Sequence, residues 1–101
     1  MIVYSLTFSI DDSVLDTWKE WLGVELYPYM EYHGLKKHQE SIVHAEQSPG
    51  TSAFNIQFLA SGLSDVQLFM VEKEPKLMEI IQRKFKDKCL VFSVILESVS
   101  L

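Results

Sequence analysis

The stretch that decides the fold lies at residues 2–13 and reads IVYSLTFSIDDS. Large apolar side chains alternate with smaller, mostly polar ones from Ile2 to Ile10, which predicts a strand with one strongly buried face. Asp11, Asp12 and Ser13 then offer capping oxygens and negative charge for the start of a helix. The chain therefore opens with a β-α unit.

Helical spacing of apolar side chains continues from this point to about residue 30. Gly23 weakens a helix interior and Pro28 removes a backbone donor, so the two predict a kink or a restarted turn. Gly34 can then close the helix in the left-handed conformation. We expect one long first helix with a distortion near its middle.

The rest of the chain supplies three more strands and a second helical region. Residues 36–46 and 51–60 are predicted arms of a hairpin around a turn at 47–50. Ser64 and Gln67 predict a capping box at the start of the second helix. Pro75 interrupts or restarts this helix, which runs to about residue 85, and residues 89–97 form the last strand.

The resulting order is βαββαβ. We expect an α+β, ferredoxin-like sandwich in which a four-stranded antiparallel sheet carries two helices on one face, as a single domain over residues 1–101. The apolar alternation predicts which strand residues lie under the helices: Tyr4, Leu6, Phe8, Phe54, Ile56, Phe58, Phe92, Val94 and Leu96.

The other face of the sheet is predicted from the hairpin register. Facing residue numbers should sum to 97, which places Val43 opposite Phe54, and a bulge would reverse the assignment for the second strand only. The far face is half apolar with uncharged polar groups between, which favours two-fold packing against a second copy in a dimeric α+β barrel. A monomer with a moderately apolar face is the alternative. The predicted dimer face comprises Val3, Ser5, Ile42, His44, Asn55, Gln57, Ser93 and Ile95.

Composition limits the partners. The 101 residues carry 9 basic and 14 acidic side chains, a net charge of −5, which disfavours nucleic acid as a partner. The chain shows no leader-like start and no apolar run of membrane-spanning length, so we expect no membrane association. A single cysteine, Cys89, in apolar surroundings fits a buried thiol in the reducing cytoplasm.

The sequence contains few residues that could form a metal, cofactor or ligand site. His38 and His44 share a strand but would lie about 20 Å apart, so no metal site is expected, and no motif indicates a cofactor. The aromatic first helix suggests a pocket against the sheet, opened by the distortion at Gly23 and Pro28. Its candidate ligand-binding residues are Trp18, Tyr29 and His33, although core packing and helix capping explain the same residues. No catalytic residue is identified.

Over nearly its full length the chain resembles a bacterial family of similar length that is known only as a domain of unknown function. The resemblance rests on the opening Met1-Ile2-Val3-Tyr4 strand, Trp18-x-x-Trp21-Leu22 with Tyr27-Pro28 after it, Gly34, Phe54-Asn55-Ile56-Gln57-Phe58, and Phe85-x-Asp87-Lys88. It implies a ferredoxin-like fold that dimerises as an α+β barrel, and no established activity. The family pattern has a histidine two residues before the proline, and this chain, which has Leu26 there, lacks whatever chemistry that histidine supplies.

Two functions remain open. The first is a small homodimeric accessory or small-ligand-binding protein without catalytic activity. The alternative is a cofactor-independent oxygenase or isomerase acting on a small aromatic or carbonyl compound. A cavity of about 300 Å³ or more between the first helix and the sheet, with a polar group in it, would favour the ligand-binding or enzymatic role. A third role, recognition through the edge of the second strand, is disfavoured by Lys36, Lys37 and Glu40.

Overall fold

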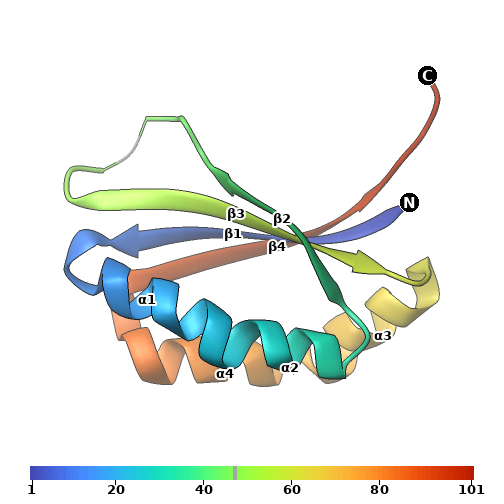
Figure 1. Cartoon of the computed structure of the whole chain (residues 1–101), viewed down its shortest axis with the longest axis horizontal. Helices are drawn as coiled ribbons and strands as arrows, with labels where there is room; N and C mark the ends of the chain where they lie inside the picture. The colour runs from blue at the N-terminus through green and yellow to red at the C-terminus, as the bar shows by residue number, and fades with distance from the viewer. Residues whose placement is uncertain (47) are drawn as a thin grey trace.

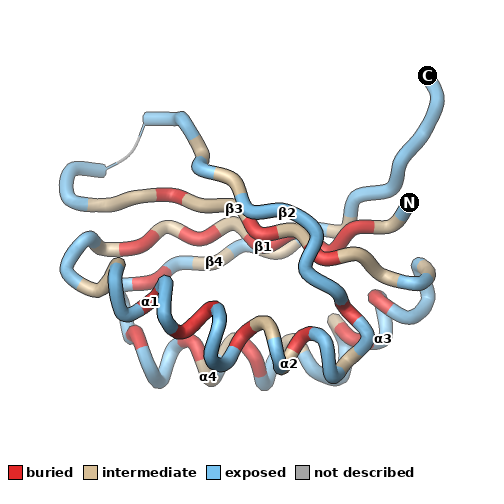
Figure 2. The backbone as a smooth tube through the Cα atoms, viewed as in Figure 1, coloured by how far each residue is buried: buried red, intermediate tan, exposed pale blue. Residues whose placement is uncertain are grey.

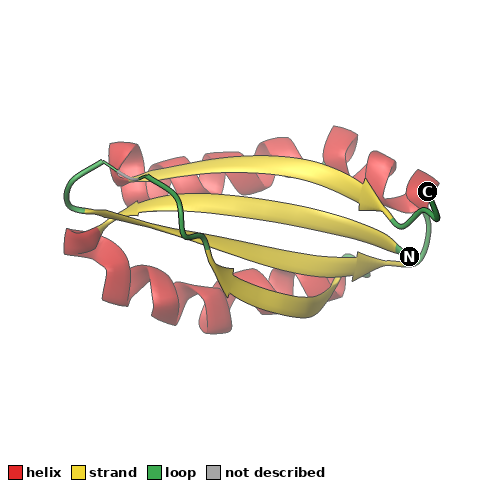
Figure 3. Cartoon of the chain, turned by 90° about the horizontal axis from the view of Figure 1, so that it is seen from above, coloured by secondary structure: helices red, strands yellow, loops and turns green. Residues whose placement is uncertain are grey.

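The computed structural model describes residues 1–46 and 48–101, and it contains a four-stranded antiparallel sheet in the order β2-β3-β1-β4. The strands are β1 (Ile2–Asp11), β2 (Lys36–Ile42), β3 (Thr51–Ala60) and β4 (Cys89–Glu97). All helices lie on one side of this sheet (Figure 1), and the view from above shows the other side uncovered (Figure 3). The predicted ferredoxin-like α+β fold is confirmed.

The helical layer has two parts. The first part runs α1 (Leu15–Trp21), a π-helical turn η2 (Leu22–Leu26) and α2 (Tyr27–Tyr32), and the second runs α3 (Leu63–Glu72) and α4 (Glu74–Phe85). Short 3₁₀ turns, Asp12–Val14 and Lys86–Lys88, connect helices to strands. The distortion predicted in the first helix is therefore real.

The π-turn follows from the sequence around Gly23 and Pro28. The Tyr27 N–H donates to the Leu22 carbonyl, five residues back instead of four, which widens the helix locally. Pro28, which has no N–H, lies in the first turn of α2, where that donor is not needed. Gly34 at φ 81° ends the helix, as predicted.

The predicted N-terminal cap is confirmed at the first helical part and is wrong at the second. Asp11 accepts from the Ser13 N–H at 2.9 Å, as expected of a capping aspartate. The capping box predicted at Ser64 is wrong, because the cap residue is Gly62 and its carbonyl already accepts the Val66 N–H at 3.3 Å. Ser64 is thus inside the first turn.

Strand β1 lies between β3 and β4, and the residues of β1 and β3 that lie under the helices are the predicted ones. Leu6 faces Ile56 and Phe8 faces Phe54. Directly opposite residues project to the same side of a sheet, so these side chains all lie under the helices. Asn55, one position along β3, therefore lies on the uncovered face of the sheet, here called the open face.

Strand β4 has the opposite orientation to the predicted one. Ser93 faces Leu6 and Ile95 faces Tyr4, so both lie under the helices and not on the open face. The sequence predicts that the more apolar of the two alternating sets of residues lies in the core. In β4 that set lies on the open face instead. The side chains of β4 on the open face, here called the β4 ridge, are Leu90, Phe92, Val94 and Leu96.

The hairpin register is also shifted from the prediction. Ile42 faces Phe54, and a bulge between Lys37 and Gln39 shifts the pairing further along β2. Ile42 is therefore on the helix side of the sheet instead of the open face. His44 lies beyond the end of β2 and is exposed. Of the predicted turn at 47–50, Gln47 lies outside the described residues.

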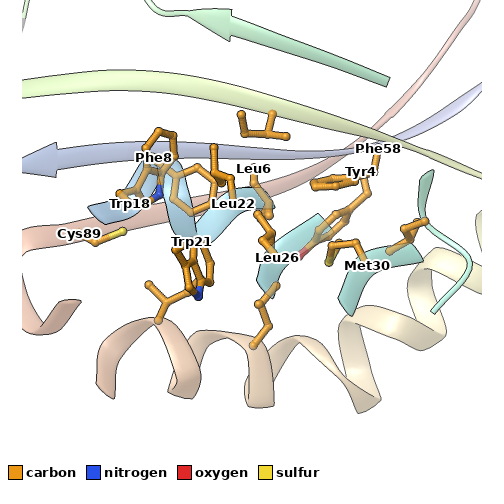
Figure 4. Close-up of a cluster of buried hydrophobic side chains, with 14 of the residues drawn as sticks. Tyr4, Leu6, Phe8, Trp18, Trp21, Leu22, Leu26, Met30, Phe58 and Cys89 are labelled. Atoms are coloured by element: carbon orange, nitrogen blue, oxygen red, sulfur yellow. The ribbon is translucent and has the colours of Figure 1, made fainter. Parts of the chain in front are cut away.

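The core occupies the space between the sheet and the helices (Figure 2). Tyr4, Leu6, Phe8 and Ile10 of β1 are fully buried there, and the close-up shows side chains of the first helical part beneath them (Figure 4). Each large apolar side chain buried in this way contributes about 1.5–3 kcal/mol. The remaining buried members of the cluster are Trp18, Trp21, Leu22, Leu26, Met30, Leu35, Ile56, Phe58, Val66, Phe69, Leu77, Ile81, Phe85 and Cys89.

The end of α4 stores a small amount of backbone strain. Lys86 has φ 56° and ψ −129°, and within the described residues it is the one non-glycine residue at positive φ. Glycine adopts this conformation without a steric penalty. Replacing Lys86→Gly should therefore raise the free energy of unfolding by about 1 kcal/mol, measured by urea denaturation. The matched change Lys84→Gly, inside the last turn of α4, should lower it by a similar amount.

Candidate ligand groove and open sheet face

A groove of about 380 Å³ lies between the first helical part and the β2 edge of the sheet. The π-turn forms one wall, through Leu22 and Gly23, and β2 forms the other, through Glu40 and Ile42. Its full lining is Trp18, Lys19, Leu22, Gly23, Tyr27, Glu40, Ser41, Ile42, Phe54 and Ile56. The groove therefore opens where the helix departs from regular geometry.

The floor of the groove is aromatic. The Trp18 indole lies with its ring centre 5.1 Å from those of both Phe8 and Phe54. Trp18 is only 1% exposed, and Figure 4 shows it beside Phe8 beneath the sheet. The groove therefore reaches only a small part of this aromatic packing, and an apolar floor of this kind favours an apolar ligand.

The rim of the groove carries a linked polar set. The Tyr27 hydroxyl donates a short hydrogen bond to Glu40, whose other carboxylate oxygen lies 3.6 Å from Lys37 Nζ. Lys37 Nζ also lies 5.2 Å from the centre of the Tyr27 ring. Burial, and then the Glu40 hydrogen bond and charge, raise the pKa of Tyr27 far above its usual value. Tyr27 is thus a neutral hydrogen-bonding group, unsuited to giving up its proton.

Both tryptophans have unpaired indole donors. Within the described part of the chain, neither Trp18 Nε1 nor Trp21 Nε1 has a hydrogen-bond partner, although both are buried. A buried donor left without a partner costs about 1–3 kcal/mol. Trp18 lines the groove, whereas Trp21 lines a separate hollow against α4, so their two N–H groups report on two different sites.

The structure does not bring the three predicted ligand-binding residues together. Trp18 lies in the groove, Tyr29 lines a separate hollow of about 270 Å³ against α4, and His33 lines a third of about 320 Å³ against α3. Tyr29 and His33 are neighbours, with ring centres 4.7 Å apart. His33 is the C-cap residue of α2, in agreement with its predicted structural role.

Sequence reasoning missed the rim residues Lys19, Tyr27 and Glu40. Tyr27 is not among the predicted ligand-binding residues, and Glu40 is predicted only to disfavour recognition through the edge of the second strand. Their pairing depends on the β2 bulge, which turns Glu40 to the helix side opposite Ile56. In the sequence, only the predicted distortion at Gly23 and Pro28 indicates where the groove lies.

Cys89 and Tyr4 are buried, and their environments make both unreactive. Burial raises the pKa of the Cys89 thiol to about 12, so it is protonated at neutral pH. The pKa of Tyr4 is raised first by burial and then by Glu74, to which its hydroxyl donates at 3.0 Å. Neither side chain is a nucleophile in this environment.

These two groups give the protein an alkaline limit. Their folded pKa values exceed the unfolded ones, so their contribution to stability is complete below about pH 9 and is lost as pH rises toward 12, because the unfolded chain releases protons that the folded one keeps. The free energy of unfolding should fall by roughly 1 kcal/mol per pH unit for each such proton. Urea titrations at pH 8 to 11 measure this slope. In the variant Cys89→Ala the free energy of unfolding should fall less steeply with pH, by the contribution of one proton. An unchanged slope would contradict the raised pKa of Cys89.

The open face differs from the groove in character. In its centre, Asn55 Nδ2 donates to Ser5 Oγ at 2.7 Å and to Thr7 Oγ1 at 3.0 Å, forming a small polar strip. Beside this strip runs the β4 ridge, whose four side chains are each 44–69% exposed. Val3, Ser5, Asn55 and Gln57 lie on this face, where the sequence placed them. Contiguous exposed apolar side chains are typical of interaction surfaces.

Among the residues that the structure describes, no group of three or more His, Cys, Asp or Glu side chains could hold a metal ion. No helix in that part of the chain has the length and apolar character needed to span a membrane.

A four-stranded sheet, helices on one face and an apolar open face together define a ferredoxin-like α+β protein, and solved structures share this arrangement. One is a dimeric ferredoxin-like protein from an uncultured marine organism, with a TM-score of 0.63 and 16% identity over 99% of this chain and 95% of that one. Another is a candidate antibiotic biosynthesis monooxygenase from Deinococcus radiodurans, with a TM-score of 0.62 and 12% identity over 100% and 95%. A third, an ethyl tert-butyl ether D family protein from Bacillus halodurans, has a TM-score of 0.58 and 17% identity over 98% and 100%.

The chain belongs to the DUF4286 family, a domain of unknown function, whose model matches residues 1–99. No curated protein matches the sequence at a significant level. The resemblance drawn from the sequence is thus confirmed, and the likeness to the solved structures extends to the fold alone.

Proposed function

We propose that this protein is a homodimer, built from one ferredoxin-like domain per chain, that binds a small and mainly apolar molecule in the groove at the π-turn. The observation that carries the binding role is the groove itself. Its volume of about 380 Å³ and its aromatic floor suit a small ligand, and the Tyr27–Glu40 pair at its rim offers the few polar contacts that orient one. The residues we assign to the site are therefore Trp18, Tyr27 and Glu40, with Tyr29 and His33 outside it.

The homodimer is supported by the open face and by the fold. The β4 ridge is exposed, and β4 has no charged residue before Glu97 to protect its free edge. Two solved structures with this fold are described as dimeric ferredoxin-like proteins. Two-fold packing would cover the ridge of each copy with the same face of the other. The lone buried thiol of Cys89 fits the reducing cytoplasm.

Ligand binding is favoured over catalysis by the state of the polar groups. An enzyme that removes a proton needs a base whose pKa lies near the working pH. Tyr27 stays protonated far above that range, and Glu40 already accepts from Tyr27 and lies near Lys37. The rim is accordingly better suited to holding a ligand than to proton transfer.

The test uses the two indole N–H signals in the ¹H–¹⁵N spectrum of the labelled protein, assigned with the variants Trp18→Phe and Trp21→Phe. Three small naphthalene probes are titrated in turn: 1-naphthylmethanol, 1-naphthoate and 1-naphthylmethylamine. We expect at least one probe to shift the Trp18 signal saturably below millimolar concentration while the Trp21 signal stays in place. If no probe moves the Trp18 signal, or if every probe moves both signals equally, the groove is not the binding site.

A further inference from the structure

We infer that the groove at the π-turn selects an apolar ligand that carries a carboxylate, with Lys19 as the residue that recognises the carboxylate. This inference rests on the proposed function, since it concerns the same groove. It assigns the chemical class of the ligand and its orientation: the apolar body on Trp18 and the carboxylate at the rim.

The orientation follows from the distribution of polarity in the groove. The floor consists of Trp18, Phe54 and Ile56, whose one polar side-chain group, the Trp18 indole N–H, is buried and carries no charge. Burying a charge there without a partner is costly, whereas the rim is open to water. A ligand with a charged end would therefore insert its apolar part and keep the charge at the rim.

The sign of that charge follows from how the rim residues are paired. Three ionisable side chains other than tyrosine lie at the rim or next to it: Lys19, Lys37 and Glu40. Glu40 accepts from Tyr27 and lies 3.6 Å from Lys37, so this acid and this base already compensate one another. Lys19 also lines the groove, and within the described residues no ion pair includes it. The uncompensated charge at the rim is thus positive, and its complement is an anion.

The overall charge of the chain cannot produce this preference. At −5 the protein repels anions at long range, so any selectivity for a carboxylate must come from a local cation. A carboxylate near an ammonium group forms a charge-assisted hydrogen bond, which in an exposed place is worth only a modest factor in affinity. The expected preference is therefore measurable but limited.

The experiment compares the three naphthalene probes, which share a ring and differ in the charge of their substituent. We expect 1-naphthoate to bind about three- to tenfold more tightly than 1-naphthylmethanol, and 1-naphthylmethylamine to bind most weakly, as read from the Trp18 indole shift. The variant Lys19→Gln should abolish the advantage of the naphthoate and leave the alcohol unchanged. Raising NaCl from 0.05 to 0.5 M should weaken the naphthoate alone.

The control variant is Lys76→Gln, which removes an exposed lysine of α4 that lines none of the three hollows and should leave all three affinities within twofold. Equal binding of the three probes, or equal losses for acid and alcohol in Lys19→Gln, would overturn the carboxylate inference while the proposed groove stands. Tightest binding of the amine would also overturn it and make Glu40 the determinant. A Trp18 signal that no probe moves would remove the proposed function itself.

Discussion

Replacing Trp18→Ala should lower the free energy of unfolding by about 3–5 kcal/mol, in the range measured for large aromatic side chains removed from cores. Trp18 is 1% exposed, and its ring packs against Phe8 of the central strand and Phe54 of β3. Its removal would also extend the groove into the core, because the same indole forms the groove floor. For a domain of ordinary stability, this loss is a large part of the total free energy of unfolding.

Urea denaturation followed by the fluorescence of the remaining Trp21 measures the loss. The conservative variant Trp18→Phe should cost clearly less, since a ring still covers Phe8 and Phe54. Trp18→Ala should also fail to bind any ligand that uses the aromatic floor, whereas Trp18→Phe should retain part of the affinity. A loss below about 1 kcal/mol for the alanine variant would mean that the helix closes over the vacated space and that the groove is not preformed.

The first strand explains why much of the fold can be predicted from the sequence. From Tyr4 to Ile10 the residues under the helices are large and apolar and the alternate ones are small and polar, so only one register buries the apolar set against the helices. The distortion at Gly23 and Pro28 is similarly local, because a missing donor acts on its own helix. Features set by a residue's own backbone or by strict alternation could thus be predicted.

Strand β4 and the groove show what cannot be predicted in this way. Both alternating sets of β4 are largely apolar, with Ser93 the one polar side chain between Cys89 and Leu96, so hydrophobicity alone does not tell the buried face from the exposed one. The register with β1 decides it, and that register depends on where the chain re-enters the sheet after α4. The Tyr27–Glu40 contact likewise needs the β2 bulge, an irregularity that no periodic pattern contains.

The error in β4 is itself informative about association. If the less apolar set of alternating residues lies under the helices, the more apolar set has been left in contact with water in a single chain. An exposed apolar ridge beside a strip of hydrogen-bonded Ser5, Thr7 and Asn55 is unfavourable for a monomer. Packing of two copies would bury the ridge and leave the polar strip with its internal partners.

Introducing a charge in the ridge should therefore dissociate the proposed dimer. Phe92 is 69% exposed and stands in the middle of the β4 ridge, so Phe92→Asp changes little inside one chain but places a carboxylate in the two-fold contact. Loss of a central aromatic contact together with burial of an unpaired charge should weaken dimerisation at least about 100-fold. Analytical ultracentrifugation at micromolar concentration should find the wild type dimeric and Phe92→Asp monomeric.

The control is Val71→Asp, because Val71 is 76% exposed on α3, on the opposite side of the molecule from the ridge. This variant carries the same new charge and should stay dimeric if the sheet face is the contact. Far-ultraviolet circular dichroism would establish that both variants are folded. A dimeric Phe92→Asp would move the interface to another surface, and a monomeric wild type would mean that the ridge is exposed in solution and open to a different partner. Because the groove and the ridge lie on opposite sides of the sheet, Phe92→Asp should keep its affinity for the naphthalene probes, which separates dimerisation from ligand binding.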